Sequence, residues 1–183
     1  DFKHASELVE FIKQFDSKTG GNQFKVFGAC YPEQHPESED VMSDIQGLKA
    51  KVDAGATHLI SQLFFDNEKF YRFLERAKLA GITVPIEAGI MPATNKKSIE
   101  RMVSLTNATL PPKFINMMER YGDSPEAIRD AGIAYAVDQI VDLVTNGVDG
   151  IHLYTMNNSY IAKRINEAVR SLFTVAPKDF VIK

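Results

Sequence analysis

Apolar positions along the chain follow two patterns, one typical of helices and one typical of buried strands. They recur at helical spacing over residues 4–15, 41–55, 67–81, 95–105, 110–122, 124–147 and 158–173. Between these segments, runs of consecutive apolar residues over 24–31, 57–65, 83–91 and 148–155 indicate strands that are covered on both faces. Gly55, Gly81 and Gly147 suit helix ends, because glycine adopts a left-handed backbone at little cost. The pattern predicts a single α/β domain over residues 1–183, built from helices and parallel strands.

Four predicted strands leave two architectures open. They could form a small doubly wound sheet, or half of an eight-stranded barrel, a fold that usually takes about 250 residues. The chain also opens on a helix that has no strand before it, although such a helix normally returns from an earlier strand. We therefore expect these units to be the later part of a longer pattern.

Composition narrows the classes of function. A net charge of -3 over 183 residues disfavours a nucleic-acid partner. No apolar run approaches the roughly 18 residues of a membrane span, and the first residues lack the features of a signal peptide. Cys30 is the only cysteine, so no internal disulfide can form. Together these features predict a cytoplasmic protein without a membrane partner.

Polar and aromatic side chains gather where the four predicted strands end, in the segments CYPEQH, SQLFFD, GIMPATNKK and LYTMNNSY. Because ligands bind at the carboxyl ends of strands in either architecture, these ends form the candidate functional face. Residue type alone leaves structural roles open. Tyr31 and His35 can pack within their loop, and Gln62 can serve a neighbouring backbone group. Asn158 can cap the last helix, and the methionines can fill gaps in the core.

Several common signatures are absent. The chain has no G-x-x-x-x-G-K-[ST], G-x-G-x-x-G or H-E-x-x-H segment and no paired cysteines, so no metal site is predicted. The lack of a glycine-rich phosphate loop also disfavours a small doubly wound protein. Cys30 is a weak candidate nucleophile because it lies in an apolar strand. The residue patterns alone therefore predict a ligand-binding face for something polar and flat.

Five blocks carry a more specific signal: ACYPEQHPES, LKAKVDAGATHLISQLFFD, GIMPATNKKSIERM, LPPKF and IHLYTMNN. In this order and spacing they resemble methylenetetrahydrofolate reductase, in a form most like that of Gram-positive bacteria. The resemblance implies a (β/α)8 barrel that binds FAD and reduces 5,10-methylenetetrahydrofolate to 5-methyltetrahydrofolate, with NAD(P)H as the expected donor. This reaction serves one-carbon metabolism and methionine synthesis. The resemblance covers the carboxyl-terminal part of such a barrel, about strands 5–8.

The resemblance also implies site residues. The cofactor-binding residues are expected to be Tyr31, His35, Asp44, Gly47 and Lys51. The substrate-binding residues are expected to be Gln62, Ser98, Met102, Met156 and Asn158. Three of these depart from better-known members of the family. Ser98 stands where a glutamine often contacts substrate, Met102 where an aromatic can stack, and Asn158 where an arginine can meet the glutamate tail of folate.

The resemblance places the remaining catalytic groups on earlier strands, so no catalytic residue is assigned here. We therefore expect the chain by itself to be inactive and to pair with the missing amino-terminal half. An alternative hypothesis is a non-catalytic half-barrel module for binding or assembly. Its open strand edges would pair with a second copy, and a homo-oligomer is expected.

Overall fold

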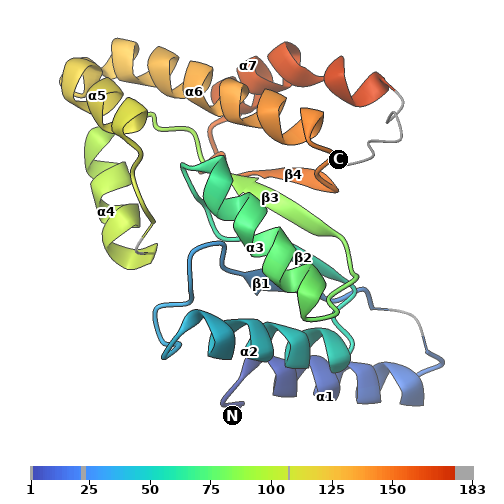
Figure 1. Cartoon of the computed structure of the whole chain (residues 1–183). Coiled ribbons are helices and arrows are strands. Elements are labelled where there is room, and N and C mark those ends of the chain that lie inside the picture. The colour runs from blue at the N-terminus through green and yellow to red at the C-terminus, as the bar shows by residue number, and fades with distance from the viewer. Residues whose placement is uncertain (1, 22–23, 107, 176–183) are drawn as a thin grey trace.

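The computed structural model describes residues 2–21, 24–106 and 108–175. Figure 1 shows the elements, which follow one another in the order α1 (Ala5–Lys18), β1 (Phe27–Cys30), α2 (Val41–Asp53), β2 (His58–Ser61), α3 (Asn67–Leu79), β3 (Ile86–Ile90), α4 (Lys96–Thr106), α5 (Pro112–Tyr121), α6 (Pro125–Thr145), β4 (Gly150–Leu153), α7 (Ser159–Val169) and a short 3-10 turn at Leu172–Thr174. None of the helices in these ranges combines the length and apolar content needed to cross a membrane.

The four strands form one parallel sheet whose spatial order, β1-β2-β3-β4, is also their order along the chain. Phe27 pairs with His58 at the β1–β2 contact, and Ala88 pairs with Ile151 at the β3–β4 contact. In Figure 1, α1 and α2 lie at the β1 end of this sheet and α6 and α7 at the β4 end. The alternating helices and parallel strands expected from the sequence are therefore confirmed.

The main core lies between the sheet and helices α2, α3, α6 and α7. Leu59, Ala88 and Ile90 point from the strands into this cluster, which α6 joins through Ile140. Gly132 lets α6 approach the backbone after β3, since a Cβ there would lie 1.8 Å from the carbonyl oxygen of Ala93. One face of each strand is thus covered by helices.

A second apolar cluster joins α4 and α5 to the ends of β2 and β3. In this cluster the ring centroids of Phe65 and Phe114 lie 4.2 Å apart. Lys113 of α5 also forms an ion pair with Asp138 of α6. Within α4, Ile99 is the only buried side chain. Helix α4 thus packs on this cluster through Ile99, with Met102 and Val103 partly buried beside it.

The helix ends follow the local sequence signals. The side chain of Ser124 accepts a hydrogen bond from the Ala127 amide, and Pro125 occupies the first turn of α6. Gly55, Gly81 and Gly147 all have positive φ, at 118°, 75° and 76°. These three positions confirm the expected helix stops.

Two features differ from the sequence pattern. The strands contain four or five residues, because the flanking apolar residues belong to loops that pack on the core. On α1, Phe11 and Phe15 of the apolar face are 54% and 50% exposed, whereas Val9 is buried. The reason is that α1 lies against α2, and no other described element covers its aromatic side.

Candidate functional site

The carboxyl ends of the four strands meet at one edge of the sheet, as parallel pairing requires. The Gln62 amide donates to the Cys30 carbonyl at 2.7 Å, and the Tyr154 amide donates to the Ile90 carbonyl at 2.9 Å. The Tyr154 hydroxyl also donates to the Ser61 carbonyl at 2.9 Å, across the end of β2. Burial raises the pKa of Tyr154, so this hydroxyl remains a donor at neutral pH. Hydrogen bonds therefore join the ends of neighbouring strands at the edge of the sheet that the sequence predicts to be the functional face.

A pocket of about 480 Å³ lies beside the end of β1. Its walls come from the start of α1, the loop after β1 and one side of α2. All five expected cofactor residues line it: Tyr31, His35, Asp44, Gly47 and Lys51. Lys3, His4 and Ser6 also line it, and sequence reasoning missed them. No local signal marks those three residues, because only the packing of α1 against α2 brings them to the pocket.

The loop from Tyr31 to Ser38 is held in place by hydrogen bonds to Asp44 of α2. The carboxylate of Asp44 accepts from the His35 amide at 3.1 Å and from the Ser38 hydroxyl at 3.4 Å. The rings of Tyr31 and His35 meet edge to face, with centroids 4.5 Å apart. Burial, with a smaller contribution from the Asp44 charge, raises the pKa of Tyr31. The loop therefore presents a neutral tyrosine and a histidine whose backbone is fixed.

Two longer-range contacts also fix this loop. The guanidinium of Arg76 on α3 donates to the Pro32 carbonyl at 3.2 Å. The carboxylate of Glu33 accepts from the Thr109 amide at 2.8 Å and from the Thr109 hydroxyl. These bonds join the loop to α3 and to the segment before α5, so the pocket wall is positioned by elements distant in sequence.

Lys51 brings a positive charge to the same pocket. Its Nζ donates to the Ala29 carbonyl at 2.6 Å. Its aliphatic stem lies over Gly28, where a Cβ would come within 2.8 Å of the Lys51 Cδ. Burial lowers the pKa of Lys51, partly offset by Cys30 and Asp44. Lys51 and Lys3 are thus the two lysines that line this pocket, and both bring positive charge to an anionic ligand.

Gly47 lies on the pocket side of α2, where packing does not call for glycine. A Cβ at this position would meet nothing within 4 Å. Glycine inside a helix costs about 0.5–1 kcal/mol relative to alanine. Its presence leaves the helix backbone open to close approach. The pocket therefore combines two lysines, the rings of Tyr31 and His35 and an open backbone with the carboxylates of Glu37 and Asp44, the latter bonded to the loop. The lysines, rings and open backbone fit a ligand with a phosphate and a flat ring.

A second pocket of about 200 Å³ lies between α4 and the loop after β4. Three of the expected substrate residues, Ser98, Met102 and Met156, line it together. Met156 has a φ of 49°, a left-handed backbone that is uncommon outside glycine. Arg101 and Tyr154 line the same pocket and were not anticipated. Arg101 could have been found from its spacing, since it follows Ser98 by three residues on a helix.

The other two expected substrate residues line neither pocket. Gln62 is half-buried, and its Oε1 accepts from the Leu63 amide at 2.9 Å. Its Nε2 has no partner within the described ranges, so the donor end is available. Asn158 instead caps α7, because its Oδ1 accepts from the Ile161 amide at 3.3 Å. The structure thus places Asn158 at a helix cap and does not bring it to the second pocket.

Cys30 is unsuited to nucleophilic chemistry. It is 1% exposed. Burial raises the pKa of its thiol to about 12, despite the opposing effect of Lys51. Because the thiolate is the reactive form, this thiol is inert at neutral pH. The weakness expected from the sequence is confirmed.

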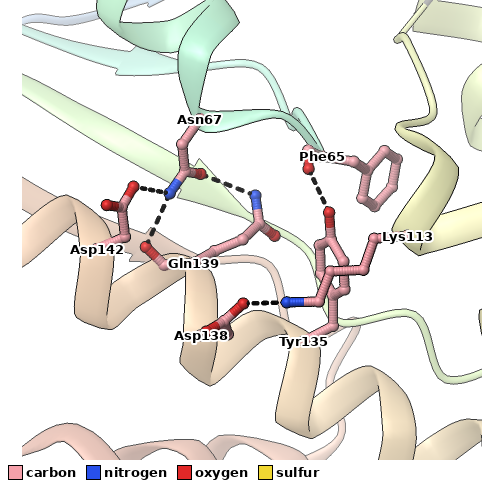
Figure 2. Close-up of polar contacts among 7 residues, drawn as sticks. All are labelled: Phe65, Asn67, Lys113, Tyr135, Asp138, Gln139 and Asp142. Carbon is pink, nitrogen blue, oxygen red and sulfur yellow. Dashed lines mark hydrogen bonds and ion pairs between the residues drawn. The ribbon is translucent and has the colours of Figure 1, made fainter.

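A polar cluster on the helical side is structural (Figure 2). Asn67, at the start of α3, donates through Nδ2 to Asp142 at 2.7 Å and to the Gln139 carbonyl at 3.1 Å. Gln139 is 6% exposed and donates through Nε2 to the Asn67 Oδ1 at 3.1 Å. The Tyr135 hydroxyl donates to the Phe65 carbonyl at 2.7 Å. These side chains bond to one another and fasten α6 to the turn before α3.

The chain is similar in sequence to curated proteins named as methylenetetrahydrofolate reductases. A protein named 5,10-methylenetetrahydrofolate reductase from Escherichia coli K12 is 36% identical over 162 residues, which cover 88% of this chain and 53% of the relative. Methylenetetrahydrofolate reductase 1 of Schizosaccharomyces pombe is 31% identical over 166 residues, covering 91% of this chain and 27% of the relative. The chain spans about half the length of the bacterial relative.

Comparison with solved structures supports the fold. A Clostridium thermocellum protein, described as binding two copies of 5-methyl-5,6,7,8-tetrahydrofolic acid, matches with a TM-score of 0.60 and 18% identity. The match covers 91% of this chain and 58% of that chain. At this identity the likeness concerns the fold alone. The family model described as methylenetetrahydrofolate reductase matches residues 1–170. On this match and these relatives, the chain belongs to the methylenetetrahydrofolate reductase family.

Proposed function

We propose that the chain is the FAD-binding carboxyl-terminal part of an enzyme that reduces 5,10-methylenetetrahydrofolate to 5-methyltetrahydrofolate, with NAD(P)H as electron donor. One observation carries the proposal: the five residues expected to bind flavin line a single pocket. They come from the loop after β1 and from α2. Side chains that merely packed in their own elements would have no reason to share one cavity.

The pocket suits the parts of a flavin dinucleotide. The Lys51 ammonium would pair with the pyrophosphate, and Gly47 would let it approach the helix backbone. Tyr31 and His35 would pack against the rest of the cofactor from a loop that Asp44 holds. Bound FAD would supply hydride transfer between the nicotinamide donor and the folate. The free Nε2 of Gln62 would orient the folate ring by donating to it.

We also propose that the four strands are about strands 5–8 of a (β/α)8 barrel. Their spatial order follows the chain order without a reversal, whereas a doubly wound sheet reverses its order at its ligand crevice. The chain also covers 53% of its Escherichia coli relative. On the face away from the helices, Phe27 is 49% exposed and His58 is half-buried. Further strands would cover this face.

The flavin proposal is tested by replacing Tyr31 and His35 together with alanine, in a preparation that retains flavin. We expect the absorbance of bound flavin to fall by more than half at equal protein, while the melting temperature changes little. Both rings are half-buried at a loop, so their loss costs little packing. Unchanged flavin content with a lower melting temperature would make the loop structural and would contradict the proposal.

Catalysis by the isolated chain is a separate question. Because groups from several strands must hold the cofactor against the substrate, four strands are not expected to suffice. We predict no NADH-driven reduction of menadione or of 5,10-methylenetetrahydrofolate by the purified chain. Turnover by the chain alone would refute the half-site proposal.

One observation favours the second candidate, a non-catalytic module that pairs with its own copy. Phe11 and Phe15 on the aromatic side of α1 are about half exposed, and β1 is an edge strand of the sheet. Sedimentation velocity separates the two candidates. A concentration-dependent dimer without flavin favours the module, and a stable monomer argues against it.

A further inference from the structure

The second pocket is lined by apolar side chains, hydroxyl groups and a single charged side chain. Met91, Met102 and Met156 give it an apolar wall, and hydroxyl groups such as that of Ser98 lie among them. Arg101 is the only charged residue that lines it. A pocket of this kind suits a ligand with an aromatic ring and one anionic end.

Arg101 is positioned to serve such a ligand. Ser98, Arg101 and Met102 are spaced by three and four residues, so they share one face of α4. The guanidinium has no hydrogen bond or ion pair with any described residue, unlike Arg76, which is held by Pro32. An unpaired guanidinium offers a planar fork that matches a carboxylate in two parallel hydrogen bonds.

The residue expected to stand near the anionic end of folate is engaged elsewhere. The side-chain oxygen of Asn158 accepts a hydrogen bond from the Ile161 amide and so caps α7. It is a neutral group that lines neither pocket. The tail of a folate at this pocket would therefore meet no cation from that position.

We propose that Arg101 binds a carboxylate of the glutamate tail of folate, while Met102, Met156 and Tyr154 enclose the aminobenzoyl ring. This inference rests on the proposed function for the identity of the ligand. It assigns recognition of the tail to α4 and not to the start of α7. Because Ile99 is the one buried side chain of α4, the contact would also help to hold that helix in place when substrate binds.

The test uses two small probes, p-aminobenzoylglutamate and the neutral p-aminobenzamide, which lacks the glutamate. Binding to the full chain is followed by the NMR shifts of labelled methionine methyl groups, assigned to Met102 and Met156. We expect Arg101→Gln to weaken p-aminobenzoylglutamate binding by about tenfold, the scale of one charged hydrogen-bonded contact. Binding of p-aminobenzamide should stay unchanged.

Two further variants sharpen the result. Arg101→Lys keeps the positive charge but cannot form two parallel hydrogen bonds with a carboxylate. We therefore expect a loss of p-aminobenzoylglutamate affinity smaller than that in Arg101→Gln. Arg72→Gln is the matched control, since Arg72 is an exposed arginine on α3 that lines neither pocket. Added salt should weaken p-aminobenzoylglutamate binding in the unaltered chain and have little effect in Arg101→Gln.

Several outcomes would overturn the inference: no methyl shift with p-aminobenzoylglutamate, an equal loss for both probes in Arg101→Gln, or the same loss in Arg72→Gln. None of these readouts depends on flavin or turnover. The proposed function can therefore fail in the flavin experiment while tail binding by Arg101 survives, and the reverse can also occur.

Discussion

Lys51 shows how one side chain serves the sheet edge and the pocket together. The Cys30 carbonyl accepts from β2, so the preceding carbonyl, that of Ala29, points to the free edge of β1. Lys51 occupies this carbonyl with its ammonium. Although Lys51 belongs to α2, its ammonium occupies a backbone acceptor of the edge strand β1. Its charge is shared between that edge and any anion in the pocket.

Affinity for flavin should depend on pH through Lys51. The ammonium form attracts the pyrophosphate, and burial lowers the pKa of Lys51 below its usual 10.5. The attraction is therefore lost at a lower pH than for an ordinary lysine. We expect FAD affinity, measured by fluorescence quenching, to fall as pH rises through the lowered pKa of Lys51.

The matching variants are Lys51→Met and Lys49→Met. Lys51→Met should bind FAD more weakly and with a shallower pH profile, because Lys3 still lines the pocket. Lys49 lies on the same helix, paired with Asp53 outside the pocket. Its replacement should leave the profile unchanged, and a flat profile in the unaltered chain would exclude the role of Lys51.

Gly47 allows stability and binding to be separated. Alanine fits its site without a close contact, so Gly47→Ala should raise the free energy of unfolding by about 0.5–1 kcal/mol. The added methyl group would narrow the pocket and lower FAD affinity by roughly tenfold. Urea denaturation and FAD titration measure the two effects. Gln46→Ala, on the exposed side of α2, is the control, and an unchanged affinity in Gly47→Ala would count against close approach of the cofactor.

At the scale of elements, helix α6 depends on a polar contact as well as an apolar one. Its buried Gln139 meets Asn67 at the start of α3, and its glycine at position 132 meets the backbone after β3. These contacts set the place of α6 over the sheet.

Asn67→Ala should lower the free energy of unfolding by about 1–3 kcal/mol, the cost of leaving buried polar groups without partners. Gln139 Nε2 would keep only the Phe64 carbonyl, at 3.4 Å. Asp142 would keep the Tyr71 hydroxyl. Urea denaturation gives the change, with Asn166→Ala on the exposed side of α7 as control. Equal stability of the two variants would show that the polar cluster does not hold α6.

At the scale of the whole molecule, we expect the exposed aromatic side of α1 to favour association between copies of the chain. Phe11 and Phe15 are about half exposed on α1. We expect Phe11→Ser with Phe15→Ser to raise the monomer fraction in sedimentation velocity, because burial of these rings favours contact between chains. The melting temperature should change little. Leu79→Ser removes an 88% exposed side chain on α3 and should have no effect on association.

Much of the fold was predictable because its signals are local. The helical spacing over residues 67–81 and the glycine at position 81 mark α3 and its end. The exposed face of α1 was not predictable, because the same spacing describes a helix whatever covers it. The extra apolar residues around each strand also misled, since loops that pack on the core are as apolar as strands.

The candidate site divides in the same way. Tyr31, His35 and Lys51 were expected from their motif, and the structure brings them to one pocket. Asn158 belongs to a motif as well, but its oxygen is used where a helix begins. A motif records which residue is present, and only packing decides which group its side chain meets.

The sequence by itself determined the order of helices and strands, their parallel direction and the segments that meet at the strand ends, because these follow from periodicity and glycine positions. Only the tertiary structure decided that the start of α1 closes the first pocket and that Arg101 is the charge of the second. Those placements depend on contacts between residues far apart in the chain, which no local pattern encodes.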